Sequence, residues 1–268
     1  MENIVPFTEF DGANVKLSKL RTLDNGGKMV YLSFNERQVI VQTPEMSTPF
    51  GLSKWENEDK RGNKTTKYTI DMSFKGMETR ETLQTFYKAL QDFDTTLLQS
   101  GVQHGEDWVN KELTSIDMAR VAYTPVIRKS KGDKYPATFK MAVPFDQRTN
   151  EFTCKVYNKS TKERMDLNDI DLKGAKTTGI VQCTGIWIAG GRYGTTWKVI
   201  QLLVDPPAKI ADFAFRKIAG DSAPDLEDDE DDAEVNPTGN DNASDDLVAS
   251  EDDEIEKKPT VKKVQGKK

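Results

Sequence analysis

Alternation of apolar and polar residues with a period of two dominates this chain and constrains its fold more than any other feature. The alternating runs are rich in Val, Ile, Thr, Tyr and Phe and are separated by Gly, Pro, Asn and Asp, a pattern typical of antiparallel β-strands. The predicted strands are residues 15–20, 29–34, 38–43, 66–74, 122–127, 138–143, 152–157, 178–188 and 195–204. Turn-forming residues at 24–27, 35–36 and 189–194 predict hairpins, and the last of these joins two long strands.

Residues 78–100 depart from this alternation and predict an amphipathic helix. Their apolar residues recur at spacings of three and four, with charged residues between them. These apolar residues are Leu83, Phe86, Tyr87, Leu90, Phe93, Leu97 and Leu98. Gly101 is expected to end the helix, and residues 105–113 predict a second short helix that presents Trp108. Because helices interrupt the strands instead of alternating with them, the predicted fold class is mainly β (α+β), with a helical insertion at about residues 78–120.

Charge divides the chain into a basic body and an acidic C-terminal stretch. Residues 221–256 contain 17 Asp and Glu and no Lys or Arg, whereas residues 257–268 contain six Lys and no acid. The remaining residues, 1–220, carry 27 acids and 32 bases, a net charge of +5. Residues 221–268 also lack aromatic residues, so we expect a disordered tail. Such a tail can compete with nucleic acid for the anion site of a basic domain or recruit basic partners, or it can serve solubility alone.

Residues 1–220 are long enough for one sizeable core, and we expect one β-rich domain that ends with a short helix at 208–218. No stretch approaches the roughly 18 apolar residues of a membrane span, and the first residues lack a signal-peptide core. Cys154 and Cys183 lie in strand-like runs without CxxC spacing. This spacing indicates buried thiols in a reducing, intracellular compartment better than it indicates a disulfide.

The sequence contains few of the residues that known catalytic and metal-binding motifs require. His104 is the only histidine and lies in an expected exposed turn, so histidine-centred triads and multi-histidine metal sites are incomplete. No phosphate-binding loop occurs. The densest carboxylate cluster, Asp166, Asn168, Asp169 and Asp171, departs from the EF-hand pattern, and we interpret it as a polar turn. We therefore expect no enzyme activity, no cofactor and no metal; hydrolase activity that depends on these aspartates is the alternative.

Cations and aromatic residues are interleaved at several places in the body. The adjacent pairs are Lys54-Trp55, Lys67-Tyr68, Lys134-Tyr135, Phe139-Lys140, Arg192-Tyr193 and Trp197-Lys198. Single-stranded nucleic acid needs both kinds of group, because bases stack on aromatic rings and phosphates require positive charge. Strand aromatics usually belong to the core, which makes Phe139, Trp187 and Trp197 core candidates as well. Basic loops at residues 60–64 and 128–135 are expected to border a binding face, unless they are merely solvated.

Several strings of residues resemble a known family. They are QTPEMS (42–47), PFGLSKW (49–55), YTP (123–125), DIDLKG (169–174), IVQCTGIW (180–187), GGRYG (190–194) and WKVIQ (197–201). On these strings the chain resembles the single-stranded-DNA-binding proteins of nucleocytoplasmic large DNA viruses. The resemblance implies an OB-like β-barrel and an acidic C-terminal tail that modulates DNA binding and contacts replication enzymes. It supplies no individual DNA contacts, so the candidate site residues come from charge and aromatic placement.

These observations together predict an OB-like antiparallel β-barrel that binds single-stranded DNA largely without sequence preference, in viral DNA replication, recombination or repair. Cations would pair with phosphates, and Trp55, Tyr135 and Tyr193 would stack on bases. The candidate residues are Lys54, Trp55, Lys60, Arg61, Lys64, Arg128, Lys129, Lys131, Lys134, Tyr135, Arg192, Tyr193 and Lys198. The alternative is a structural or scaffolding protein of the virion or the replication factory, which binds other proteins.

The expected partners are single-stranded DNA and, through the acidic tail, replication or recombination proteins, with no membrane; homo-oligomerisation is left open. We expect the protein in the host cytoplasm, at a viral factory, or in the nucleus, with packaging in the virion as a further alternative. The pairs Lys257-Lys258 and Lys262-Lys263 fit either a nuclear-import signal or a second DNA-contacting tip. The choice between DNA and RNA depends on contacts to the 2′-hydroxyl, which the sequence does not locate.

Overall fold

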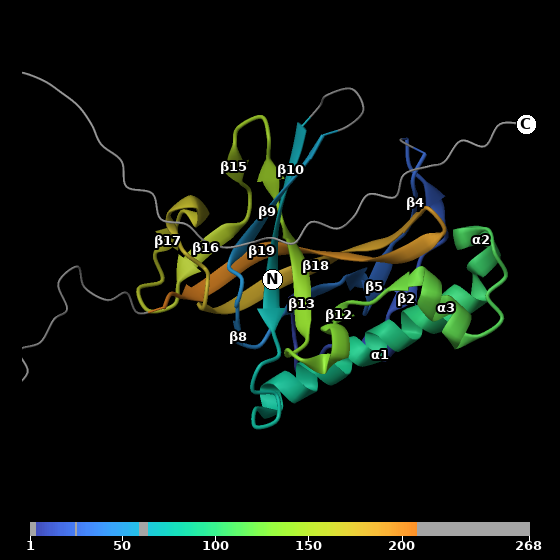
Figure 1. Cartoon of the computed structure of the whole chain (residues 1–268), viewed down its shortest axis with the longest axis horizontal. Helices are drawn as coiled ribbons and strands as arrows, with labels where there is room; N and C mark the ends of the chain where they lie inside the picture. Colours follow the sequence, from blue (N-terminus) through green and yellow to red (C-terminus); the bar gives the residue numbers. More distant parts are fainter. Residues whose placement is uncertain (1–3, 25, 59–63, 208–268) are drawn as a thin grey trace, which may run out of the picture. The chain divides into compact units, whose positions relative to one another are not determined.

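The longest strands of the protein form one hairpin. In the computed structural model, β18 (Lys176–Ala189) and β19 (Arg192–Asp205) pair antiparallel (Figure 1, orange). Gly190 and Gly191 join them with φ angles of 59° and 73°. A type I′ hairpin turn requires two consecutive positive φ angles, which glycine adopts without strain. The predicted hairpin is confirmed, and each strand extends at both ends beyond its predicted range.

The residues that the structure describes are 4–24, 26–58 and 64–207. The tail predicted at 221–268, the helix predicted at 208–218, and the loop cations Lys60 and Arg61 lie outside them. The division into a domain and a tail at residue 220 therefore stays a prediction.

Three further strands close the long hairpin into a ring. They are β8 (Met46–Ser47), β10 (Lys64–Ser73) and β13 (Thr138–Val143). Each strand pairs with the next in the order β18, β8, β10, β13, β19, and β19 returns to β18. Among these five strands only β13 and β19 pair in parallel, at Ala142 and Lys198. A closed, mostly antiparallel ring of five strands is an OB-like barrel, which confirms the predicted fold class.

The remaining strands are short extensions of this barrel or belong to small separate sheets. They are β1 (Val5–Pro6), β2 (Lys16–Leu17), β3 (Arg21–Thr22), β4 (Lys28–Val30), β5 (Leu32–Phe34), β6 (Arg37–Gln38), β7 (Ile40–Gln42), β9 (Leu52–Glu58), β11 (Tyr123–Thr124), β12 (Ile127–Arg128), β14 (Phe145–Asp146), β15 (Glu151–Phe152), β16 (Lys155–Asn158) and β17 (Arg164–Met165). Three-residue 3-10 helices occur at η1 (Gly12–Asn14), η2 (Lys131–Asp133) and η3 (Leu167–Asp169).

Several predicted strands are interrupted because the chain changes sheets within them. The run 29–34 divides into β4, which pairs with β18, and β5, which pairs with β2 and β6. The run 152–157 divides in the same way into β15 and β16, which pair with β14 and β19. Strand β9 is not among the predictions, because most of its side chains are exposed and it is held by pairing with β10 rather than by burial.

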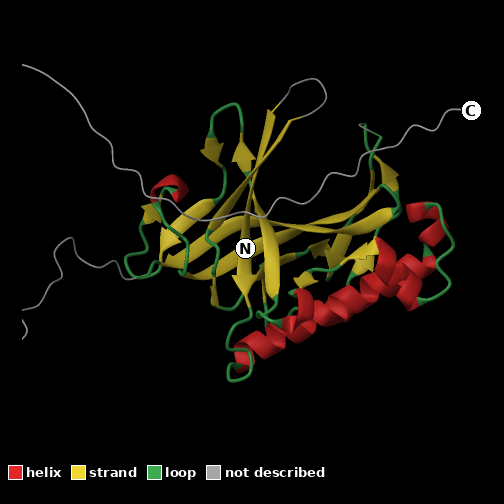
Figure 2. Ribbon diagram, in the orientation of Figure 1, coloured by secondary structure: helices red, strands yellow, loops and turns green. Residues whose placement is uncertain are grey.

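The helical insertion lies between β10 and β13 and covers one side of the strands (Figure 2). It consists of α1 (Glu81–Gln103), α2 (Gly105–Val109) and α3 (Ile116–Ala122). Five residues of the apolar stripe predicted for α1 are buried, namely Leu83, Phe86, Leu90, Phe93 and Leu97, whereas Tyr87 and Leu98 are half-buried. Trp108 on α2 is buried. The expectation that Gly101 ends α1 is wrong: Gly101 lies within the helix, where an added Cβ would overlap the Tyr193 hydroxyl. Close packing, and not helix termination, therefore requires glycine at this position.

Aromatic side chains join α1 to the barrel in a common core. Phe86 on α1 contacts Phe139 on β13, with ring centroids 5.8 Å apart, and Phe93 contacts Trp197 on β19 at 5.6 Å. Both contacts are edge-on, the arrangement that aromatic pairs favour. The core assignment of Phe139 and Trp197 is confirmed, whereas Trp187 is half-buried. All described residues consequently belong to one compact unit.

Candidate nucleic-acid interface

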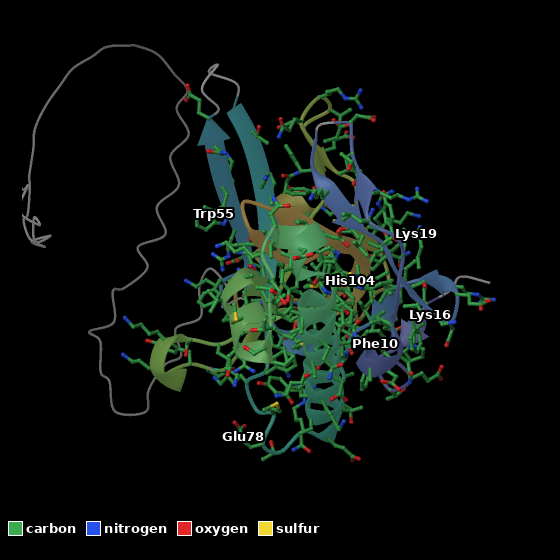
Figure 3. All side chains as sticks on the ribbon, turned by 90° about the vertical axis from the view of Figure 1, so that its right-hand side faces the viewer. Phe10, Lys16, Lys19, Trp55, Glu78 and His104 are labelled. Atoms are coloured by element: carbon green, nitrogen blue, oxygen red, sulfur yellow. The ribbon has the colours of Figure 1, made fainter. Side chains whose placement is uncertain are left out.

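The hairpin of β9 and β10 presents different side chains on its two faces. Trp55 stands opposite Lys67, and Lys54 stands opposite Tyr68. Because successive residues of a strand point to opposite faces, Trp55 and Lys67 share one face and Lys54 and Tyr68 share the other. The Tyr68 ring packs against the β14–β15 hairpin. The other face is open, and Trp55, 62% exposed, projects from it (Figure 3).

A cation lies over the exposed indole. The Nζ atom of Lys140 is 5.6 Å from the centroid of the Trp55 ring, within the range of a cation–π interaction. Lys140 Nζ is also 3.8 Å from Asp71 Oδ2, and the two side chains are only 22% and 13% exposed. Thr138 Oγ1 donates a hydrogen bond to Asp71 Oδ1 at 3.4 Å. This network holds Lys140 in place and, through it, orients the indole.

Short side chains separate Trp55 from the next cation on the same face. Ser53 stands opposite Thr69, Thr69 opposite Ala142, and Ala142 opposite Lys198. Since paired residues share a face, Lys198 lies on the face of Trp55, across β10 and β13. A row of short side chains allows a flat ligand to approach the sheet between an aromatic ring and a cation.

Two more of the predicted cations lie on this face. Arg128 stands opposite Thr138 in the β12–β13 pair, on the side to which Lys140 points. Arg192 is exposed and precedes Lys198 on β19 by an even number of residues, so the two share a face, about 20 Å apart along the strand. We call the outward side of β9, β10, β12, β13 and β19 the Trp55 face. Its cations are Lys67, Arg128, Lys140, Arg192 and Lys198.

The basic loop that follows Arg128 extends from the edge of the Trp55 face. Ser130 Oγ closes the loop, because it accepts a hydrogen bond from the Tyr135 amide at 2.9 Å and donates one to the Tyr135 carbonyl at 3.0 Å. Tyr135 is 64% exposed, and Lys134 Nζ lies 5.6 Å from the centroid of its ring. Lys129 and Lys131 are exposed as well. The loop thus offers a second accessible aromatic ring surrounded by cations.

Lys54, which the sequence predicts to share a binding site with Trp55, does not share a face with it. It lies on the face opposite Trp55, and its Nζ atom is 2.7 Å from Glu56 Oε1. The hydrogen bond to this carboxylate raises the pKa of Lys54. Lys64, another predicted cation, is the first residue of β10. The structure therefore groups Trp55 with Lys140 and Lys67 instead.

The expectation that Tyr193 stacks on a base is wrong. Its side chain is fully buried beneath α1, where the hydroxyl donates to the Leu97 carbonyl at 3.4 Å. The ring lies 5.1 Å from that of Tyr123, and Gly101 leaves room for its outer edge. Burial raises the pKa of Tyr193 to about 12. Tyr193 is a core residue that docks the helical insertion on β19.

The residues considered for catalysis have structural roles. Asp166 accepts a hydrogen bond from the Asn168 amide at 2.9 Å, and Asp171 accepts one from the Lys173 amide at 2.8 Å. This segment is thus the polar turn predicted from its sequence. His104 is exposed and stacks on Trp108, with centroids 5.4 Å apart. Within the ranges that the structure describes, no group of three or more His, Cys, Asp or Glu residues could hold a metal ion.

The two cysteines are free and buried, as their sequence context predicts. Burial raises the pKa of Cys154 to about 11 and that of Cys183 to about 12, which leaves both thiols protonated and weakly nucleophilic near neutral pH. In the described part of the chain, none of the helices combines the length and the apolar character needed to cross a bilayer.

A family model matches residues 80–217, and its description is Family of unknown function (DUF5871). The chain belongs to this family. The matched residues include the helical insertion and the ring strands β13, β18 and β19. They therefore contain the basic loop and half of the Trp55 face, whereas Trp55 itself precedes them. No curated protein matches the sequence.

Solved structures of two phage proteins are distantly similar to this family member. One is gp2.5, a single-stranded-DNA-binding protein encoded by bacteriophage T7, at 13% identity and a TM-score of 0.38, covering 66% of this chain and 98% of that one. The other is the single-stranded-DNA-binding protein from bacteriophage Enc34, at 11% identity and a TM-score of 0.35, covering 72% and 94%. At these values the likeness is too distant to carry a conclusion about function.

Two cations of the Trp55 face, Lys67 and Lys140, are missing from the predicted site, although both belong to cation–aromatic pairs. Lys140 alternates along its strand with buried residues, because it lies between Phe139 and Met141, both fully buried. Lys67 is exposed between the half-buried Thr66 and Tyr68. That alternation is the sequence signal for an outward cation on a barrel strand. The register between β10 and β13, which brings Lys140 to Asp71 and Trp55, cannot be obtained from one strand alone.

Proposed function

We propose that this protein binds single-stranded DNA on the Trp55 face, largely without sequence preference and without catalysis. The observation that carries the proposal is an exposed indole, Trp55, beside the fixed cation Lys140 on a face where further cations outnumber acids. Bases stack on aromatic rings whatever their identity, and phosphates pair with cations. In OB-like barrels the face of the second and third strands, here β10 and β13, is the usual oligonucleotide site.

The Trp55 face suits unpaired bases better than a duplex. In a duplex each base is stacked on its neighbours, so the protein would have to unstack it before the indole could contact its flat face. A single strand offers that face directly, and each stacked base contributes about 1–3 kcal/mol. Cations attract both forms, so the preference rests on Trp55 and on Tyr135 in the adjacent loop.

We further propose that the acidic stretch 221–256 competes with DNA for the Trp55 face and recruits proteins of viral DNA replication, recombination or repair. Its support is the charge of the chain: 17 acids without a base, against a body of net charge +5. A polyanion offers these cations closely spaced negative charge, as the phosphate backbone of DNA does. The proposed place of action is a viral factory in the host cytoplasm, or the nucleus.

Fluorescence anisotropy with a labelled oligo-dT tests both proposals. Full-length protein is compared with a 1–220 truncation across a salt series, with duplex DNA as competitor. We expect salt-sensitive binding that prefers the single strand, with log K falling about 0.7 per neutralised phosphate for each unit of log salt. Truncation removes 17 acids and six lysines and should tighten binding. Equal affinity of the full-length and truncated proteins would mean that the tail serves only solubility, and no binding by either would favour the scaffolding alternative.

A further inference from the structure

In the part of the chain that the structure describes, one edge of strand β9 pairs with no other strand. Its only partner there is β10, with which it pairs along its whole length. The hairpin of β9 and β10 projects from the barrel (Figure 1). From Lys54 to Glu58 every side chain of β9 is exposed. A strand edge of seven residues that is left open in this way is a template for pairing with another strand.

Alternate residues of β9 direct their backbone groups toward this edge. On β10, the even-numbered residues point away from β9: the Phe74 amide donates to the Ala137 carbonyl at 2.9 Å, on the side of β13. The Thr66 carbonyl likewise accepts from the Gln147 side chain at 3.3 Å. Opposite residues of an antiparallel pair point either both toward each other or both away, and even-numbered residues of β10 stand opposite even-numbered residues of β9. The residues of β9 whose backbone N–H and C=O groups point away from β10 are therefore Leu52, Lys54, Glu56 and Glu58.

The charges of β9 select one register for antiparallel pairing of this edge with a second β9 strand. Because only even-numbered residues direct backbone groups to the edge, they must stand opposite one another. With Trp55 on the two-fold axis, Lys54 of each copy stands opposite Glu56 of the other. A shift by two residues in either direction instead places Lys54 opposite Lys54, or Glu56 opposite Glu56. Opposite charges across a strand pair stabilise it and like charges destabilise it, so the register centred on Trp55 is favoured.

The side chains on both faces of β9 fit this register. Lys54 Nζ already lies 2.7 Å from Glu56 Oε1 of its own chain. A carboxylate accepts from more than one donor, so Lys54 of the second copy adds a partner to Glu56 and displaces none. On the other face, Trp55 and its counterpart form a pair without backbone hydrogen bonds between them, the kind in which side chains lie closest. Cross-strand aromatic pairs of this kind stabilise a sheet.

We propose that β9 pairs antiparallel with β9 of a second copy of the chain, centred on Trp55, and that the two copies form a two-fold symmetric dimer. A two-fold axis uses the same surface on both copies, and a strand edge whose charges complement themselves meets that requirement. The axis is perpendicular to the joined sheet, so both copies of the Trp55 face lie on the same side of it. If the proposed function holds, the dimer offers single-stranded DNA one continuous face with both indoles at its centre. The pairing itself needs no DNA.

Sedimentation equilibrium of the full-length protein without DNA tests the pairing separately from DNA binding. We expect twice the mass of one chain for the unchanged protein. Lys54→Glu and Glu56→Lys should each raise the dimer Kd by about tenfold or more, because two attractive cross-strand pairs become repulsive. An equimolar mixture of the two variants restores both opposite-charge pairs and should recover the dimer. The proposal would be overturned by a single-chain mass for the unchanged protein at its highest soluble concentration, by an unchanged Kd of either variant, or by a mixture no tighter than its components.

A disulfide reports the register directly. Trp55→Cys places two thiols opposite each other at the axis, with Cα atoms about 4.5 Å apart, which a disulfide can span. Asn57→Cys is the matched control, because it is exposed on the same strand but stands opposite Ser53 of the other copy, which leaves its two thiols about 14 Å apart. Under mild oxidation only Trp55→Cys should give a covalent two-chain band on a non-reducing gel; Cys154 and Cys183 are buried and should not compete. Equal cross-linking of the two variants, or none with Trp55→Cys, would contradict the register.

Discussion

The Trp55 face and the helical layer are two surfaces of the same barrel that carry opposite charge. Residues 78–122 contain eight acids and four bases, a net charge of −4, whereas the outward residues of β10, β13 and β19 include Lys67, Lys140, Arg192 and Lys198 against Asp71 and Asp205. A barrel strand assigns every second residue to the core and leaves the others free. The outward positions can therefore accumulate charge for a ligand at little cost to folding.

Tyr193 and Trp55 illustrate the difference between the two regions. Each follows a cation in the sequence, and both were expected to stack on bases. Trp55 lies on a hairpin face that no other described element covers, whereas Tyr193 lies where α1 closes over β19. An aromatic residue next to a cation is thus a binding candidate only when its face of the sheet is left open.

Substitution of Tyr193 should have the largest effect. Tyr193→Ala removes a fully buried ring between β19 and α1 and should lower the free energy of unfolding by about 3–5 kcal/mol, as truncation of large core aromatics does. Urea denaturation followed by tryptophan fluorescence measures this loss. Tyr193→Leu, which keeps an apolar side chain, should bind oligo-dT like the unchanged protein once folded. A selective loss of affinity in that variant would return Tyr193 to the binding site.

Substitution of Trp55 should have the opposite signature. Trp55→Ala should weaken binding to oligo-dT by about 1–3 kcal/mol, the contribution of one stacked base. The ring is 62% exposed, so the urea midpoint should stay within measurement error. Anisotropy titrations at fixed salt give the affinity, and Trp55→Phe should recover part of it because a smaller ring still stacks. Unchanged affinity of Trp55→Ala would move the proposed site away from this hairpin.

Substitution of the cations across the barrel should change the salt dependence of DNA binding rather than the stacking of bases on Trp55. Lys140→Gln with Lys198→Gln should reduce the slope of log K against log salt by about 1.4 if each residue pairs with one phosphate. The loss of Lys140 should also make the Trp55 indole more mobile, because Lys140 contacts the ring and is itself held by its ion pair with Asp71. Titration at several salt concentrations separates these effects. An unaltered slope would show that neither lysine pairs with a phosphate.

The sequence predicts the architecture of this protein better than its binding face. Alternation and turn residues locate the long strands and the β18–β19 hairpin, because both signals are local. The short strands escape prediction, since their limits depend on which sheet the chain joins next. Gly101 illustrates the same point: its position suggests the end of a helix, and only the tertiary contact with Tyr193 explains why it lies inside α1.

The candidate site depends on strand register, which no single segment encodes. Arg128, Lys198 and Trp55 are predicted from composition and do share a face. Lys140 becomes part of the site only because β13 pairs with β10 so that Lys140 faces Asp71. Lys54 illustrates the converse, since one step along β9 from Trp55 takes it to the opposite face.

Lys67 and Lys54 provide the most sensitive test, because they lie on the same hairpin and occupy its opposite faces. Lys67→Gln should reduce the salt slope by about 0.7, the value for one phosphate contact. Lys54→Gln should leave the slope unchanged, because Lys54 points away from the Trp55 face and is already paired with Glu56. Both residues are exposed, so neither change should affect the urea midpoint. Equal effects of the two substitutions would mean that DNA wraps around the hairpin and contacts both faces, and the proposed division between an open and a covered face would then fail.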